Sequence, residues 1–371
     1  MAERVVLHIG TMKSGTSYLQ SVLVRNLEAL EGAGYHFLGG AFGAQTRAVR
    51  DVVRGGSGQD WAKLAQEARH GTAQAGLVSM EFLSFAREPA LNALLGPLEG
   101  LPVDVVVTVR DQFRAIPAQW QTYARNHGTS SWSDYLHEIG AYRVGGRSPH
   151  RTPTRAFRTF HRAQDVPAIL GRWSGHPGVR SVTVVTVPPP DAAREVLWDR
   201  FALAAGIEVD VAFDGLRENI SLGYASCDFL CRLNRHLDDS LQLRYTRMLR
   251  PIAREVLLPL RTTEGRPELD RGAARYARSR NEEFRTTLRG AGLPIVGSLE
   301  DLPVREAPAG GRGPVLPPDE DKVRRAAWAV HQHLLEGPGT EAGPAAAPDA
   351  PLDEIVGEVA QLLRRRLARP R

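Results

Sequence analysis

The sequence predicts an α/β fold: a three-layer sandwich with a central, mainly parallel sheet and a helical C-terminal part. Short β-branched runs alternate with stretches that carry apolar residues at helical spacing through the first half of the chain. This alternation is typical of parallel strands joined by right-handed helical crossovers. With 371 residues, the chain is also long enough to bury a large core.

The first unit of the pattern is an apolar strand at residues 4–9, a loop with Gly10 and Gly15, and a helix from Thr16 to Leu30. Between Trp132 and Arg172 the chain is rich in arginine, histidine and aromatics, and we expect irregular structure there. Further strands are expected at residues 35–38, 76–80, 103–109 and 179–187, and further helices at 61–69, after Glu81, after Arg110 and at 192–204.

The domain organisation follows from composition. We expect an α/β domain over residues 1–302, a Pro/Gly/Arg linker at 303–318, an amphipathic helix at 319–336, a flexible Gly/Ala/Pro linker at 337–351 and a C-terminal amphipathic helix at 352–371. One apolar stripe on the last helix must be buried, on its own domain or in a homodimer; it comprises Leu352, Ile355, Val356, Val359, Leu363 and Leu367.

The loop after the first strand carries one of only three lysines among 47 basic residues. Lys13 lies in the run His8-Ile9-Gly10-Thr11-Met12-Lys13-Ser14-Gly15-Thr16-Ser17. A compact ammonium suits a single contact with a phosphate or sulfate oxygen. The first N–H groups of the following helix also favour an anion, and Ser14, Thr16 and Ser17 add hydroxyl groups. We therefore expect an anion site here.

An ordinary ATP or GTP loop reads G-x-x-x-x-G-K-[ST], with its hydroxyl on magnesium. Here Gly10 and Gly15 keep the glycine separation, but Thr16 stands where the lysine belongs, and the lysine lies at position 13. This departure argues against an ordinary kinase or NTPase. It also predicts that no metal is required, because the lysine-hydroxyl pair that serves magnesium is missing.

The sequence K-[ST]-G-T-[ST] after an N-terminal strand resembles the 5′-phosphosulfate loop of sulfotransferases that use 3′-phosphoadenosine-5′-phosphosulfate (PAPS). The resemblance covers roughly residues 4–237 and includes segments 165–198 and 217–223. It implies a P-loop-type fold, and a PAPS site formed by Lys13, Ser14, Gly15, Thr16 and Ser17.

Arg110 follows the most strand-like run of the chain, residues 103–109, and should face the same crevice as Lys13. Sulfotransferases have an arginine at this point and a serine eight residues later, which together hold the 3′-phosphate. The resemblance implies that role for Arg110, but the eighth residue is Ala118, which has no hydroxyl. Arg114 or Gln119 could compensate, and Asp111 is a plausible N-cap for the next helix.

Two further residues take roles from the resemblance. Glu81 ends the strand at residues 76–80 and resembles the glutamate base of heparan N-sulfotransferases, which takes a proton from the acceptor. The alternative bases are His127 and His8, and capping is the alternative role for Glu81. Arg217 could reach the 3′-phosphate, or could lie in solvent while Asn219 or Ser221 caps a helix.

Composition limits the partners. The net charge of +5 comes from dispersed arginines, which supports an anionic small ligand better than nucleic acid. No signal peptide or membrane-spanning run is recognisable, so we expect a cytoplasmic protein without membrane contact. Arg, Ala, Gly and Pro enrichment suggests a bacterium of high G+C content. Cys227 and Cys231 are expected to be buried reduced thiols.

These observations predict a bacterial, cytoplasmic, PAPS-dependent sulfotransferase in which Lys13 and Glu81 are catalytic and Arg110 and Arg217 help to bind the nucleotide. The acceptor would be a hydroxyl or amine of a small molecule or carbohydrate, reacting by in-line transfer. The irregular segment after Trp132 would supply the acceptor pocket. Two alternatives remain: an inactive nucleotide-binding module of the same fold, which Ala118 favours, and an atypical P-loop kinase.

Overall fold

The computed structural model describes residues 2–143, 145, 147, 148, 150–216, 221–238, 242–304, 315–336 and 350–368. The chain divides into two compact units, each made of three segments. Unit 1 comprises Met1–Ala115, His161–Asn219 and Ala277–Glu306, and unit 2 comprises Ile116–Phe160, Ile220–Tyr276 and Ala307–Arg371. This grouping cuts across the domain expected over residues 1–302.

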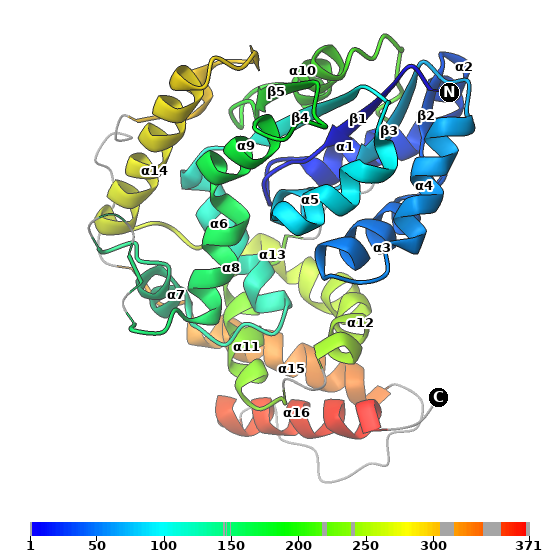
Figure 1. Ribbon diagram of the computed structural model, residues 1–371. Coiled ribbons are helices and arrows are strands. Elements are labelled where there is room, and N and C mark those ends of the chain that lie inside the picture. The colour runs from blue at the N-terminus through cyan, green and yellow to red at the C-terminus, as the bar shows by residue number, and fades with distance from the viewer. Residues whose placement is uncertain are drawn as a thin grey trace. The chain divides into compact units, whose positions relative to one another are not determined.

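Unit 1 contains a six-stranded, all-parallel sheet, which confirms the predicted fold class. The strand order is β2-β3-β1-β4-β5-β6, so β1 lies between β3 and β4 (Figure 1). His8 at the end of β1 is in register with Ser79 of β3 and Val106 of β4. The strands are β1 Arg4–His8, β2 Tyr35–Phe37, β3 Ala75–Ser79, β4 Val103–Val109, β5 Ser181–Thr186 and β6 Ile295–Val296.

Helices cover both faces of this sheet. On one face lie α1 Thr16–Arg25, α2 Leu27–Gly32 and α10 Glu195–Ala205. On the other lie α3 Phe42–Val53, α4 Gln59–His70, α5 Glu88–Leu95, α9 Val166–Ser174 and the last part of α14 Arg271–Gly290. Three layers result, with a separate apolar core on each side of the sheet.

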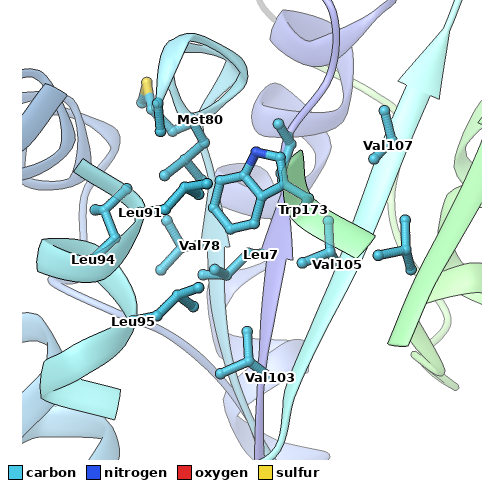
Figure 2. Close-up of a cluster of buried hydrophobic side chains, with 14 of the residues drawn as sticks. Leu7, Val78, Met80, Leu91, Leu94, Leu95, Val103, Val105, Val107 and Trp173 are labelled. Carbon is cyan, nitrogen blue, oxygen red and sulfur yellow. The ribbon is translucent and has the colours of Figure 1, made fainter. Parts of the chain in front are cut away.

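Alternation along the strands supplies both cores, because successive side chains of a strand point to opposite faces. Val5 and Leu7 of β1 enter the core below α5 and α9, whereas Val6 enters the core below α1 and α10. Figure 2 shows the indole of Trp173 from α9 beside Leu7 and near Val105 of β4. All of these side chains are buried.

Two local expectations differ from the structure. The single helix expected from Thr16 to Leu30 is divided at Asn26, which has φ −115° and whose amide donates to the carbonyls of Val22 and Ala212. This side chain therefore bonds to the backbone in place of a continuing helix. The periodicity of the apolar residues did not reveal this break.

The expectation of irregular structure between Trp132 and Arg172 is also wrong. This region contains α7 Trp132–Glu138, α8 Arg155–Gln164 and α9. In α8 the buried face is narrow, because only Ala156, Phe160, Ala163 and Gln164 are buried and the rest is largely charged or polar. With so few apolar residues, the segment has no clear amphipathic pattern in the sequence, so the helix was not predicted.

Three helices cross the division between the units, since α8, α14 and α6 Gln112–Arg125 each begin in one and end in the other. Unit 2 otherwise consists of helices: α7, α11 Tyr224–Arg235, α12 Gln242–Ile252, α13 Leu258–Glu264, α15 Glu320–Glu336 and α16 Leu352–Ala368. A π-helical turn, Ala253–Leu257, joins α12 to α13. None of the described helices is long and apolar enough to cross a membrane.

The C-terminal helix lies against its own chain. Its apolar stripe is buried, and α16 packs on α15 and α11 within unit 2. Between α15 and α16, the buried imidazole of His331 lies 2.8 Å from the carboxylate of Glu358. Cys227 and Cys231 of α11 are buried free thiols, as expected. Most of the two expected linkers, residues 305–314 and 337–349, lies outside the described residues.

Replacing Leu7 by alanine should lower the free energy of unfolding by about 3 kcal/mol, because a fully buried side chain at the centre of the sheet leaves a cavity. Urea denaturation followed by circular dichroism measures this change. Leu203→Ala is the matched control, since Leu203 of α10 is 73% exposed and should shift the midpoint little. Equal losses in the two variants would contradict the described core.

Candidate anion-binding site

The loop after β1 lies where the direction of the chain connections changes. From β1 the chain passes to one face through α1 and α2, whereas after β3 and β4 it passes to the other face through α5 and α9. Ligands of open parallel sheets bind beyond the carboxyl ends of the strands at such a point. Residues 9–15 follow β1 at this edge of the sheet.

A chain of hydroxyl groups fixes the shape of the loop. Ser14 Oγ donates to the carbonyl of Thr11 at 2.6 Å and lies 2.7 Å from Thr108 Oγ1 of β4. Because the single hydroxyl hydrogen of Ser14 is donated to Thr11, the hydroxyl of Thr108 must donate to Ser14 Oγ. The backbone N–H of Thr11 also donates to the carbonyl of Thr108, at 3.0 Å. Thr11 and Ser14 therefore both attach the loop to β4.

His8 completes this chain from inside the sheet. Its Nε2 lies 3.2 Å from Thr108 Oγ1 and its Nδ1 lies 2.8 Å from Ser79 Oγ. Since Thr108 donates to Ser14, the Nε2–H of His8 donates to Thr108 and Nδ1 accepts from Ser79. Burial lowers the pKa of His8 to about 3, so the imidazole is neutral. Both ring nitrogens are occupied, which argues against His8 as a base.

The helix N-terminus next to this loop has unused donors. Gly15 precedes α1 with φ 88°, and no side chain caps the helix. Within the described residues, the N–H groups of Gly15, Thr16 and Ser17 donate to no protein acceptor. The hydroxyl of Thr16 is also buried, with the residue 4% exposed, and it too has no partner among the described residues. An incoming anion would satisfy these groups.

Gly10 brings the backbone close to these hydroxyl groups. A Cβ atom at Gly10 would collide with Thr16 Oγ1 and Thr108 Oγ1 and would lie 2.9 Å from Ser14 Oγ. Only glycine therefore allows three hydroxyl side chains to surround this position.

Lys13 and Arg110, which the sequence assigned to one site, lie together. Arg110 Nη1 donates to the carbonyl of Lys13 at 3.0 Å, so the cation after β4 holds the backbone that carries the lysine. Lys13 has φ 69°, a left-handed conformation that costs energy for a side chain with a Cβ. Such conformations concentrate at functional sites.

Glu81 lies at the same edge, at the start of the 3₁₀ turn η1 Glu81–Phe85 that follows β3. Gln20 of α1 donates through Nε2 to Glu81 Oε2 at 3.2 Å and to the carbonyl of Ser79 at 2.8 Å. The carboxylate is therefore held against α1, the helix that begins after the loop with Lys13.

The remaining expected residues contribute unequally. Asp111 accepts from the N–H of Arg114 at 3.2 Å, which confirms the expected N-cap. The Arg114 guanidinium bonds to Asp111 and to the carbonyl of Pro188, so it is already engaged within unit 1. Ala118 and Gln119 belong to unit 2, as does the buried His127. Arg217 lies outside the described residues.

Sequence reasoning missed Thr108, Ser79 and Gln20, which hold the loop and the carboxylate. Thr108 is the one hydroxyl residue in the apolar strand Val103–Val109, and a polar residue near the end of a buried strand could have drawn attention. The role of Gln20 could not be predicted, because its partners Ser79 and Glu81 are distant in sequence.

No family model, curated protein or solved structure matches the chain.

Ser14 and Thr16 should respond differently to loss of their hydroxyl groups. Ser14→Ala removes a buried hydroxyl that links Thr11 to Thr108 and should lower the free energy of unfolding by about 1–2 kcal/mol. Thr16→Val keeps the shape of a hydroxyl that has no protein partner and should change stability by less than about 0.5 kcal/mol. Urea denaturation compares them; a larger loss for Thr16→Val would contradict the assignment of partners.

Acid should destabilise the protein partly through His8. Because its folded pKa of about 3 is below the unfolded value of 6.5, the unfolded chain binds the proton first, and stability falls as pH falls through this window. Between pH 6.5 and 5, wild type should lose about 1.5 kcal/mol more than His8→Gln, which has no such group. Urea titrations of both proteins at the two pH values measure the difference, and parallel losses would refute a buried neutral His8.

Proposed function

We propose that this protein is a sulfotransferase that binds PAPS at the loop after β1 and transfers its sulfuryl group to a hydroxyl or amine of a small-molecule or carbohydrate acceptor. The observation that carries the proposal is the α1 N-terminus, where unused N–H donors and a buried hydroxyl without a protein partner adjoin Lys13. An anion with several oxygens fits this donor set.

The loop offers several hydrogen-bond donors and a positive charge, which suit the many oxygens and the negative charge of the 5′-phosphosulfate of PAPS. Gly15, Thr16 and Ser17 offer backbone donors, Thr16 offers its hydroxyl, and Lys13 offers a positive charge. The donors of Ser14 are different, because its hydroxyl is spent on the carbonyl of Thr11. The backbone N–H of Ser14 also donates to the carbonyl of Thr11, at 3.3 Å, so Ser14 acts by fixing the loop.

Bound PAPS supplies the sulfuryl group, and the chain supplies charge and proton transfer. Lys13 and the helix N-terminus stabilise negative charge that develops on phosphate oxygens, which is effective because these donors are already in place. Arg110 would bind the 3′-phosphate from the end of β4 while it holds the carbonyl of Lys13. Glu81, held by Gln20, would accept the proton of the acceptor.

Two alternatives predict different behaviour. An inactive module of this fold would bind the nucleotide without turnover, and Ala118, which lacks the family's hydroxyl, favours it. A kinase would prefer ATP with magnesium, but Thr16 occupies the position of its lysine.

The test is calorimetric titration of the purified chain with 3′-phosphoadenosine-5′-phosphate, the desulfated product, without metal and in parallel with ATP. Wild type should prefer the bisphosphate. Lys13→Ala and Thr16→Val should each weaken binding by about tenfold or more, as expected for loss of a charged or buried donor to an anion.

Thr16→Val is the sharper variant, because its stability should be unchanged while its affinity falls. Equal affinity in wild type and Thr16→Val would remove the hydroxyl from the site. Absence of bisphosphate binding, or preference for ATP with magnesium, would overturn the sulfotransferase proposal.

A further inference from the structure

A second concentration of positive charge surrounds η1, the turn that begins with Glu81. Three guanidinium groups from three different helices contact this turn. Arg50 of α3 lies over the ring of Phe82 at 5.2 Å, Arg162 of α8 lies over the ring of Phe85 at 4.5 Å, and Arg172 of α9 donates to the carbonyl of Ser84 at 3.1 Å. We call these residues, with the neighbouring Arg54 and Arg87, the basic cluster.

The members of the basic cluster repel one another. Burial lowers the pKa of Arg50, Arg162 and Arg172, and neighbouring arginines lower each of them further. Arg54 acts on Arg50 and Arg162, and Arg87 acts on Arg162 and Arg172. Positive charges are thus held close together although their mutual repulsion is unfavourable.

Nearby carboxylates do not neutralise this charge. None of the five arginines forms an ion pair with any carboxylate of the described residues. Asp165 raises the pKa of Arg172 but caps α9, accepting from the N–H of Ala168 at 3.1 Å. Asp51 accepts from the N–H of Gly58 at 2.8 Å. The cluster is therefore short of anions within its own chain.

Three arginines of the basic cluster are fixed by contacts with η1, and all five are at least partly exposed. Arg50 and Arg172 are partly exposed, and Arg54, Arg87 and Arg162 are exposed. Arg50 and Arg162 contact the aromatic rings through the faces of their guanidinium groups, and Arg172 donates to the carbonyl of Ser84 through one nitrogen. Other N–H groups of these side chains are left for a ligand. Planar guanidinium forks bind carboxylate, sulfate or phosphate oxygens in pairs.

We propose that the basic cluster is a second anion site, which binds carboxylate, sulfate or phosphate groups of the acceptor substrate and thereby brings its hydroxyl or amine to Glu81. The acceptor class is a small molecule or carbohydrate with at least two negative groups. This proposal rests on the proposed function, because it assigns the acceptor of that reaction. Its geometric basis is that η1 joins the cluster to Glu81, and Gln20 joins Glu81 to α1.

Citrate, which carries three carboxylates, is a suitable probe. Calorimetric titration at low ionic strength should detect citrate binding to wild type, both alone and with saturating 3′-phosphoadenosine-5′-phosphate. The double variant Arg87→Gln/Arg162→Gln should weaken citrate binding by about tenfold or more, since it removes two charge-assisted contacts to the carboxylates. Both arginines are exposed, so this variant should fold; its thermal unfolding midpoint checks this.

Two variants serve as controls. Arg254→Gln replaces an exposed arginine of unit 2 and removes one positive charge, as each substitution of the double variant does. It should leave citrate binding unchanged. Lys13→Ala should also leave it unchanged, because citrate and the bisphosphate occupy different sites. No citrate binding, an equal loss in Arg254→Gln, or competition between citrate and the bisphosphate would overturn the proposal.

The two proposals fail separately. Citrate binding that depends on Arg87 and Arg162, without any bisphosphate binding, would refute the sulfotransferase and the acceptor assignment while leaving the anion site. Bisphosphate binding without citrate binding would refute the second site alone.

Discussion

The hydroxyl of Thr108 is the contact on which the candidate site depends most. It receives a hydrogen bond from His8 and donates one to Ser14, and the carbonyl of the same residue accepts from the N–H of Thr11. The other ring nitrogen of His8, Nδ1, accepts from Ser79, which requires a neutral imidazole, and burial keeps it neutral. With these partners satisfied by one another, the donors at the start of α1 are left over for a ligand.

Two hydroxyl groups within three residues of each other differ in their hydrogen-bond partners. Ser14 is bonded on the protein side, whereas Thr16, two residues later, has a buried hydroxyl with no partner among the described residues. Burying such a group costs free energy unless a hydrogen bond compensates it. The cost is understandable where a bound anion supplies the missing bond, and sequence alone gives both residues the same chemical character.

Charge is arranged in the same way along the sheet edge. Arg110 binds the backbone of Lys13 and thereby brings two cations to one loop, while the basic cluster is arranged around the turn that begins at Glu81. Glu81 is linked to both regions, because it begins η1 and its carboxylate accepts from Gln20 of α1. Positive charge on both sides of Glu81 would suit the proposed reaction, because an anionic donor and an anionic acceptor repel each other.

Local pattern was sufficient for five of the six strands and for most helices flanking the sheet, but it did not predict β6 Ile295–Val296. Alternation of β-branched runs with helical periodicity predicts a parallel sheet, and glycine, lysine and hydroxyl residues between a strand and a helix indicate an anion site, because both signals depend on neighbouring residues alone. The break at Asn26, the helix α8 and the partners of Ser14, Gln20 and Arg172 depend on residues distant in sequence. Hydrogen bonds and charge repulsion between distant segments exist only once the chain has folded, so these features were decided by packing.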